Sequence, residues 1–290
     1  MVGWQLSGTY GTASGVVRWD RFGNPEGEPL VLLHGTPFSS LVWRDVGRAL
    51  AAHHQVYVWD MPGYGCSERA EGQDLSLAAM GRVFAGLLGH WNLTDPLVVA
   101  HDSGGAVALG AHLLHGAGYR RLALVDAVSL PPWGSAFSRL VGEHAHVFEQ
   151  LPLPVHAALV REYVGSASGP GLTPAVLDAL TAPWLGEEGR AAFHRQLVQR
   201  LDDRRYTDVM QDRYGTIDLP VLVCCGEQDT WVPPARGREL ASRIPGARLR
   251  VLPGAGHLAP VDAAAELATA LFAFLHDVHD PHPPNDLTRP

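Results

Sequence analysis

The sequence predicts an α/β fold in which helices cover both faces of a mostly parallel central sheet. Short runs of β-type residues alternate with helical patterns up to about residue 126. Most of these runs are apolar throughout, which is typical of parallel strands buried on both faces. The alternation stops near residue 130 and resumes near residue 219. The interruption predicts an insertion between two strands of the sheet.

The predicted elements follow one another in a regular order. We expect residues 4–20 to form a hairpin at the sheet edge. The later strands are LVLLH (30–34), QVYVWD (55–60), PLVVAH (96–101), RLALVD (121–126), LPVLVCCG (219–226) and ARLRVLPGAG (247–256). Helical patterns cover about residues 39–53, 76–91 and 104–115. A chain of 290 residues is long enough to bury a large core in one domain of this kind.

The inserted segment has a different character from the rest of the chain. Residues 130–216 show helical periodicity, Pro-rich breaks and no strand pattern. We therefore expect a core domain of residues 1–129 and 217–277, with a helical cap, residues 130–216, inserted after the sixth strand. Residues 278–290 are rich in Pro, His and Asp, which is typical of a disordered tail.

Composition excludes several functional classes. The net charge is -8, and no Lys/Arg cluster marks a phosphate-binding face, so nucleic acid is not an expected partner. Cys66, Cys224 and Cys225 fit neither a disulfide framework nor the spacing of a zinc site. The first residues, MVGWQLSGTY, show no basic segment followed by an apolar run, so we expect no export signal. No apolar run reaches about 18 residues, the length needed to span a membrane. We expect a cytoplasmic monomer or homodimer without membrane contact and without a bound metal.

Polar residues follow several of the predicted strands. They lie in HGTP (34–37), AHDSGG (100–105), GEQDTW (226–231) and GAGHL (254–258). In open parallel sheets, ligands bind beyond the carboxyl ends of the strands. We therefore expect these four segments to meet at one site.

The segment AHDSGG places an acid and a hydroxyl side by side at a strand-to-helix turn. Such a turn needs small residues two positions before and two positions after its central residue. Centring the turn on Asp102 places Ala100 and Gly104 at these positions, whereas centring it on Ser103 would place His101 at one of them. The sequence therefore predicts Asp102 at the bend and Ser103 in the first turn of the helix.

The backbone N–H groups of Ser103 and Thr36 can then form an oxyanion hole. At this point the ordered segments HGTPFSSLVWR, DMPGYGCSE, AHDSGG, GEQD and GAGH resemble the α/β-hydrolase fold over about residues 13–275. The Asp at the bend, where esterases and lipases of this fold have Ser, is similar to that of haloalkane dehalogenases, haloacetate dehalogenases and epoxide hydrolases.

The resemblance implies a nucleophile at Asp102, a histidine base at His257 and a supporting acid at Asp229. Asp126 is the alternative acid, because some dehalogenases have theirs at the end of that strand. A carboxylate can displace a leaving group from saturated carbon or open a strained ring, and the histidine then activates water to hydrolyse the resulting ester. No metal or organic cofactor is required, and the expected partners are a small apolar substrate and water.

The leaving-group contacts are less well defined by the sequence. Ser103 stands where many haloalkane dehalogenases have Trp and haloacetate dehalogenases have Arg, and Thr36 is a further donor beside it. In the cap, the candidate substrate-binding residues are Trp133, Phe148, Trp184 and Tyr206.

The cap segments are mostly apolar, and no arginine pair is positioned to bind a small acid. We therefore expect hydrolysis of a carbon–halogen bond in an apolar molecule, ahead of epoxide opening and with haloacetate last. Two other interpretations stay open. One is ester or lactone hydrolysis with Ser103 or water attacking, and the other is a non-catalytic ligand-binding protein of the same fold.

Overall fold

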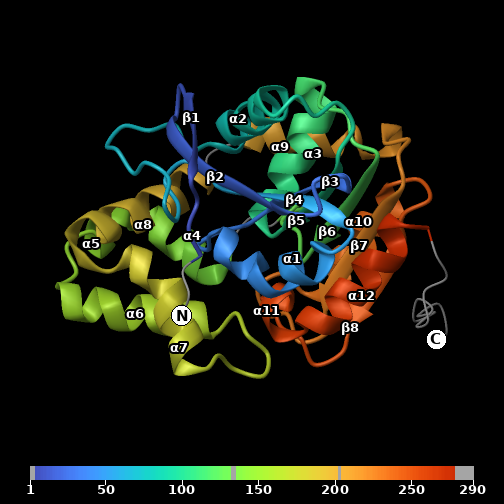
Figure 1. Ribbon diagram of the computed structural model, residues 1–290. Helices are drawn as coiled ribbons and strands as arrows, with labels where there is room; N and C mark the ends of the chain where they lie inside the picture. Colours follow the sequence, from blue (N-terminus) through green and yellow to red (C-terminus); the bar gives the residue numbers. More distant parts are fainter. Residues whose placement is uncertain (1–3, 132–134, 202–203, 278–290) are drawn as a thin grey trace.

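An eight-stranded sheet forms the centre of the computed structural model, which describes residues 4–131, 135–201 and 204–277 (Figure 1). The strands lie in the order β1-β2-β4-β3-β5-β6-β7-β8. Their bounds are β1 Gly8–Thr12, β2 Gly15–Gly23, β3 Glu28–Leu33, β4 His54–Asp60, β5 Leu97–His101, β6 Arg121–Val125, β7 Val221–Gly226 and β8 Arg248–Leu252. The α/β fold class predicted from the alternating pattern is confirmed.

Strands β1 and β2 form the expected antiparallel hairpin at one edge of the sheet, and β2 pairs with β4. From β4 to β8 the neighbouring strands are parallel. The carboxyl ends of these strands consequently point in one direction. The loops that follow β3, β5, β6, β7 and β8 meet at this edge, where the candidate site lies.

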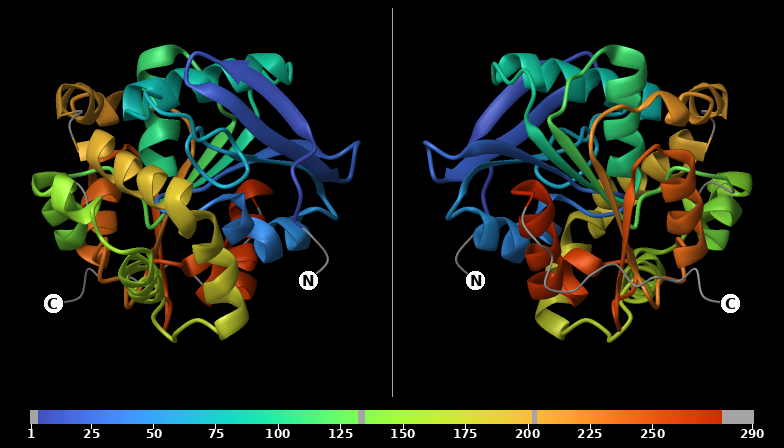
Figure 2. Two further views of the ribbon diagram at one scale, coloured as in Figure 1. Left: turned by 90° about the vertical axis from the view of Figure 1, so that its left-hand side faces the viewer. Right: turned by 90° about the vertical axis from the view of Figure 1, so that its right-hand side faces the viewer.

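Helices cover both faces of the sheet (Figure 2). Helices α2 and α3 pack together on one face, while α1 and α12 contact each other on the other face. The bounds of the helices outside the insertion are η1 Ser40–Trp43, α1 Arg44–Leu50, α2 Leu77–His90, α3 Ser103–His115, α10 Pro234–Arg243, α11 Ala259–Asp262 and α12 Ala264–Leu275. None of the helices in the described ranges is both long enough and apolar enough to cross a membrane.

The described residues between β6 and β7 form helices joined by loops, with no strand among them. The helices are α4 Ala136–Glu143, α5 Ala145–Phe148, α6 Leu153–Gly165, α7 Pro174–Thr181, η2 Ala182–Trp184, α8 Gly186–Leu201, α9 Arg204–Gln211 and η3 Tyr214–Thr216. Helices α4 to α8 gather beside the sheet and are called the cap helices below (Figure 1). Helix α9 instead packs against α3, on the core.

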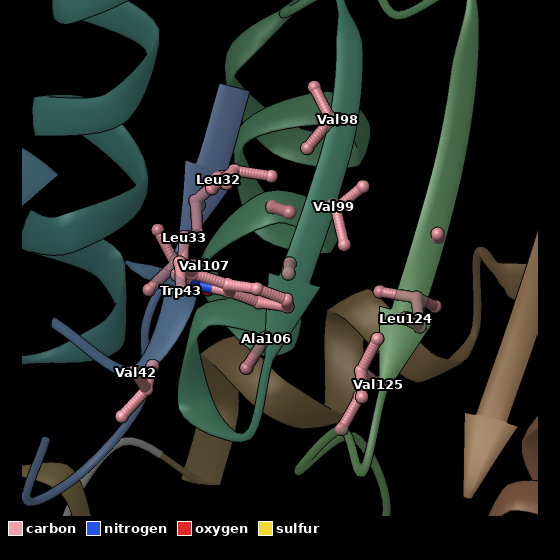
Figure 3. Packing of buried hydrophobic residues seen from close by; sticks show 14 of the residues in the cluster. Leu32, Leu33, Val42, Trp43, Val98, Val99, Ala106, Val107, Leu124 and Val125 are labelled. Atoms are coloured by element: carbon pink, nitrogen blue, oxygen red, sulfur yellow. The ribbon is translucent and has the colours of Figure 1, made fainter. Parts of the chain in front are cut away.

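The core surrounds β5, the strand that leads to the predicted bend. All five residues of β5 are buried, as its continuous apolar run requires. Figure 3 shows Val98 and Val99 of β5 between side chains of the neighbouring strands and of α3, among them Leu32, Leu124 and Val107. The strand end is therefore held on both sides by packed apolar residues. This packing fixes the position of the residue that follows it.

Candidate active site

Asp102, and not Ser103, occupies the bend between β5 and α3. Its backbone has φ 51° and ψ -123°, a conformation that residues other than glycine rarely adopt. Three backbone hydrogen bonds hold it there. The Asp102 N–H donates to Val125 at 3.1 Å, and its carbonyl accepts from Gly105 at 3.0 Å and Val128 at 2.9 Å. The strained backbone is thus fixed by neighbouring elements.

Two glycines allow the bend to fit against the strand beside it. A Cβ atom on Gly35 would lie 2.3 Å from the Cβ of Asp102, and a Cβ on Gly104 would lie 2.4 Å from the carbonyl oxygen of His34. No side chain tolerates contacts this short. Glycine at these positions therefore brings the HGTP loop and the bend close enough for Thr36 to reach Asp102.

The structure brings Asp102, His257 and Asp229 together in one row. Nδ1 of His257 lies 2.9 Å from Oδ2 of Asp229, and Nε2 lies 3.2 Å from Oδ2 of Asp102. The second oxygen of Asp229 accepts backbone N–H bonds from Trp231 at 2.7 Å and Val232 at 2.8 Å. Asp229 is thereby fixed as an acceptor for Nδ1 of the imidazole, which leaves Nε2 facing Asp102.

The environment of His257 favours its protonated form. Burial lowers the pKa of His257, but the charge of Asp229 and the hydrogen bond to Asp102 outweigh burial and raise the pKa well above its usual range. The neighbouring His101 shows the opposite balance. Burial and the charge of His257 lower the pKa of His101 to about 4. His101 is therefore neutral near pH 7, and its Nε2 donates to the His257 carbonyl at 2.7 Å.

Asp126, the alternative acid, has a different set of contacts. Its Oδ1 accepts the N–H of Gly226 at 2.7 Å, and its side chain is buried. Burial, followed by the charge of Asp229, raises the pKa of Asp126 well above its usual range. The imidazole of His257 bonds to Asp229 instead. The geometry therefore favours Asp229 as the acid that orients His257 and gives Asp126 a role in anchoring the end of β7.

The predicted oxyanion-hole residues lie beside Asp102. The Thr36 N–H donates to Oδ1 of Asp102 at 2.6 Å. Ser103 is the first residue of α3, where backbone N–H groups have no partner within the helix. Oδ1 is thus held by the Thr36 N–H at the start of α3, while Oδ2 faces His257.

A buried row of hydroxyl groups connects this point to the cap. The Tyr64 hydroxyl donates to Oε1 of Gln196 at 3.1 Å. Tyr64 is also 2.7 Å from the Thr36 hydroxyl, which lies 3.1 Å from the Ser103 hydroxyl. Because the one Tyr64 proton goes to Gln196, the Thr36 hydroxyl must donate to Tyr64. The expectation that this hydroxyl donates to a leaving group therefore conflicts with its hydrogen bonding.

A cavity of about 300 Å³ opens onto Asp102. Its wall combines polar and apolar side chains. The described lining residues are Thr36, Asp102, Ala127, Val128, Ser129, Leu130, Ser135, Ala136, Ser138, Arg139, Tyr163, Thr230, Trp231, Val232, Pro233 and Arg236. Two arginines, one from α4 and one from α10, thus line the cavity, although no arginine pair was expected. They come from segments far apart in sequence, so no local pattern brings them together.

The predicted cap contacts lie elsewhere. Trp133 falls outside the described residues. Trp184 is buried and donates its indole N–H to the Pro37 carbonyl at 2.6 Å, so this N–H is engaged within the protein. Phe148 packs against Phe137. Tyr206 lies on α9 against the far half of α3, with its hydroxyl 3.3 Å from His115. None of these three described side chains lines the cavity beside Asp102.

Trp231 is a site residue that the sequence argument missed. Its ring stacks on His257 with centroids 5.0 Å apart and on Tyr163 of α6 with centroids 4.2 Å apart. Its indole N–H donates to Ser166 at 3.2 Å. Trp231 therefore links the imidazole to a cap helix. The available signal was its position in GEQDTW, two residues after Asp229.

The described residues contain no group of three or more His, Cys, Asp and Glu side chains arranged to hold a metal ion. The site contains the Asp102 carboxylate at a strained bend and the His257 imidazole, which the Asp229 carboxylate orients. A backbone N–H donor lies beside the Asp102 carboxylate. A family model of the alpha/beta hydrolase fold matches residues 28–264. The chain belongs to this family.

Relatives of this hydrolase differ in their described activities. An alpha/beta hydrolase fold protein from Burkholderia ambifaria is 41% identical, with a TM-score of 0.87, covering 92% of this chain and 97% of that one. The dihydrolipoyllysine-residue acetyltransferase component of the acetoin cleaving system of Pseudomonas putida is 28% identical over 90% of this chain, which spans 66% of that protein. A non-heme haloperoxidase of Rhodococcus erythropolis is also 28% identical, covering 80% of this chain and 86% of that protein. Membership of this family supports a hydrolase but does not identify the reaction, which has to be argued from the geometry of the site.

Proposed function

We propose that this hydrolase acts through Asp102, which forms an alkyl ester with its substrate, and that its first candidate reaction is hydrolysis of a carbon–halogen bond. One observation supports this proposal above the others. The side chain at the bend is a carboxylate, with one oxygen held by the Thr36 N–H and the other 3.2 Å from Nε2 of His257. Ester hydrolysis by Ser103 has less support, because its hydroxyl lies against Thr36 and the imidazole faces Asp102.

The first step is a displacement at saturated carbon. Oδ2 of Asp102 attacks the carbon from the side opposite the halogen, and a carbon–oxygen bond forms as the carbon–halogen bond breaks. The halide leaves with the bonding electron pair. The backbone of Asp102 and its hydrogen bond from the Thr36 N–H already hold the carboxylate in place, so little conformational freedom of this side chain is lost when it reaches the attack geometry. The product of this step is an ester of Asp102.

The second step hydrolyses that ester. Nε2 of His257 takes a proton from water, and the water oxygen attacks Cγ of Asp102. The negative charge that develops on Oδ1 is stabilised by the N–H groups of Thr36 and Ser103. The alcohol then leaves as His257 returns the proton. Asp102 is restored with one oxygen from water, and the net products are alcohol, halide and a proton.

Esterification itself prepares His257 to act as a base. In the free enzyme the hydrogen bond and charge of Asp102 help to raise the pKa of His257. The ester has no charge, so this contribution disappears when the intermediate forms. The pKa of His257 then falls, and the imidazole releases its proton at the stage where a neutral base is needed.

Epoxide opening is a second candidate, supported by Tyr163. This tyrosine of α6 lines the cavity, and its hydroxyl lies 3.1 Å from that of Ser138 and 3.3 Å from that of Ser135. A phenol at this place can donate a hydrogen bond to the oxygen of an opening ring. Both candidates share the Asp102 ester, and the leaving group distinguishes them.

A single turnover in heavy-oxygen water tests the proposal. Incorporation of label into the Asp102 peptide, detected by mass spectrometry, is the expected result with a substrate halide or epoxide. His257→Gln should accumulate the ester as a mass increase on the same peptide, and Asp102→Ala should abolish turnover. Ser103→Ala is the matched control and should retain the labelling. Full activity in Asp102→Ala, or loss of labelling only in Ser103→Ala, would overturn the proposal.

A further inference from the structure

The cavity beside Asp102 has an unusual charge for this protein. The chain has a net charge of -8, yet the cavity wall contains two arginines, Arg139 and Arg236, and Asp102 is the only acidic residue among the described lining residues. An apolar substrate gives no reason for two guanidinium groups at its binding site. Arginine is well suited to bind carboxylates, because its planar donors match the two oxygens of the anion.

The arginines and Asp102 lie at different depths. Asp102 is only 4% exposed, whereas the Arg236 side chain is 36% exposed and Arg139 is exposed. The carboxylate of Asp102 therefore lies at the inner end of the cavity and the guanidinium groups lie toward solvent. The wall also includes apolar side chains, among them Val128, Leu130 and Val232. The cavity thus combines a buried reactive group, apolar wall residues and two cationic side chains nearer solvent.

The positive charge of Arg236 is only partly compensated. Its Nη1 lies 3.3 Å from Oε2 of Glu239, but Oε1 of the same glutamate lies 2.6 Å from Arg243. Glu239 thus shares its single charge between two arginines and is closer to Arg243. A guanidinium has five N–H donors, and the contact with Glu239 uses only one of its nitrogens. Arg236 therefore has charge and donors to offer to a ligand.

We propose that the substrate is an amphiphilic carboxylate, bound with its carboxylate at Arg139 and Arg236 and its reacting carbon at Asp102. The placement of the reacting carbon at Asp102 rests on the proposed function. The cavity volume of about 300 Å³ corresponds to roughly ten water-sized groups at about 30 Å³ each. An acid with an apolar chain of several carbons between carboxylate and leaving group fits this space. An acid whose carboxylate is adjacent to its reacting carbon would leave most of this volume unfilled.

The arrangement also serves the electrostatics of the reaction. Asp102 is an anion in its attacking form and would repel an anionic substrate that was bound nearby. Distance reduces this repulsion, and the two arginines oppose it. When the substrate carboxylate binds to the two arginines, their positive charges compensate its negative charge, although Asp102 is also an anion. This binding also orients the alkyl chain of the substrate so that its apolar end points toward Asp102.

A binding measurement tests this inference without requiring turnover. Calorimetry on the unreactive variant Asp102→Asn compares hexanoate with hexanol. We expect hexanoate to bind at least tenfold more tightly than hexanol, and its affinity to decrease with added salt. We expect Arg139→Gln and Arg236→Gln each to reduce the affinity for hexanoate about tenfold without affecting the affinity for hexanol. Arg161→Gln, at the surface ion pair with Asp178, is the matched control. Hexanoate binding no tighter than hexanol, or equally weakened by Arg161→Gln, overturns the inference.

A turnover measurement separates this inference from the proposed function. The wild-type enzyme is assayed with two substrates, hexanoate and hexanol, each bearing bromine on the terminal carbon, and their turnover is compared. We expect a higher kcat/KM for the acid, with the preference lost in the Arg139→Gln, Arg236→Gln double variant through KM and not through kcat. Label in the Asp102 peptide with both compounds but no preference for the acid overturns the inference alone. Absence of label with both, while hexanoate still binds at the arginines, overturns the proposed function alone.

Discussion

At the scale of single residues, the tautomer of His257 is the critical feature of the candidate site. Asp229 accepts two backbone N–H bonds on one oxygen and faces Nδ1 of His257 with the other. A carboxylate is an acceptor on both oxygens, so Nδ1 must bear a proton. Nε2 can then be free of its proton in the neutral imidazole. This is the form required for the proposed base.

Replacing Asp229 with Asn should reverse this arrangement. The amide oxygen keeps the bonds from the Trp231 and Val232 backbone, so the NH₂ group faces Nδ1 and makes Nδ1 an acceptor. The proton then resides on Nε2, which can no longer accept one from water. We expect ester hydrolysis to slow on the order of a thousandfold or more, with the Asp102 ester accumulating in mass spectra. Asp126→Asn is the control, and it should retain activity within a few-fold. Equal losses in the two variants would contradict the assignment of Asp229.

The charge of Asp102 provides a second test at this scale. Because Asp102 helps to raise the pKa of His257, the neutral variant Asp102→Asn should have a lower His257 pKa than the wild type. The shift mimics the effect of ester formation. NMR titration of the His257 ring resonances measures both values. A His257 pKa that is unchanged or higher in Asp102→Asn would show that Asp102 does not control the protonation of the base.

At the scale of elements, α8 holds the cap helices to the core through a loop that follows β4. The side chain of Gln199 accepts the Leu75 N–H at 2.5 Å and donates to the Gln73 carbonyl at 2.8 Å. Arg195 donates to the Ala70 carbonyl at 2.6 Å, and Arg69 donates in the other direction to the Pro183 carbonyl. One helix face thus satisfies backbone groups in the loop 69–75. These bonds position the cap helices beside the cavity.

Gln199→Leu should loosen this attachment. The variant leaves the Leu75 N–H and the Gln73 carbonyl without their side-chain partner, which costs roughly 1–3 kcal/mol when such groups stay buried. We expect a matching decrease in the free energy of unfolding and faster amide exchange at Leu75. Gln150→Leu, at an exposed position in the turn between α5 and α6, is the control and should change stability by less than about 0.5 kcal/mol. Unchanged exchange at Leu75 would exclude the role given to Gln199.

The sequence predicted the core elements better than the cavity, for a physical reason. Apolar strands and amphipathic helices are local patterns, so the bounds of β4, β5, β6 and α2 agree closely with the expected ranges. The bend is also local, because small residues on either side specify it. Pairing of His257 with Asp229 instead of Asp126 depends on how three loops pack. The meeting of Arg139 and Arg236 depends on the angle at which the insertion returns over the sheet, which no sequence spacing encodes.

At the scale of the whole molecule, buried histidines couple the fold to pH. His194 of α8 is fully buried, and neither ring nitrogen has a hydrogen-bond partner within the described part of the chain. Burial, followed by the charges of His156 and Arg190, lowers the pKa of His194 to about 4. His101 in the core has a pKa of about 4 for a related reason. Both rings are neutral in the folded protein over a range where exposed histidines are protonated.

These lowered values make the fold sensitive to acid. An unfolded histidine takes up its proton near pH 6.5 and the folded ring only near pH 4, so the unfolded state binds more protons between these values. Stability is therefore lost as pH falls through this window and is fully present above it. Since one pKa unit corresponds to about 1.4 kcal/mol, we expect the stability lost through His194 alone to reach about 2 kcal/mol by pH 5.

His194→Leu should remove this acid-dependent loss. The substitution replaces a buried polar ring that lacks partners with an apolar side chain, so stability at pH 7 should be unchanged or higher. Urea unfolding at pH 7 and pH 5 measures the difference, which we expect to be smaller in the variant than in the wild type by about 1–2 kcal/mol. His146→Gln, at an exposed position of the cap helices, should keep the wild-type difference. The same loss between pH 7 and pH 5 in wild type and His194→Leu would assign the acid sensitivity to other groups, with His101 the next to replace.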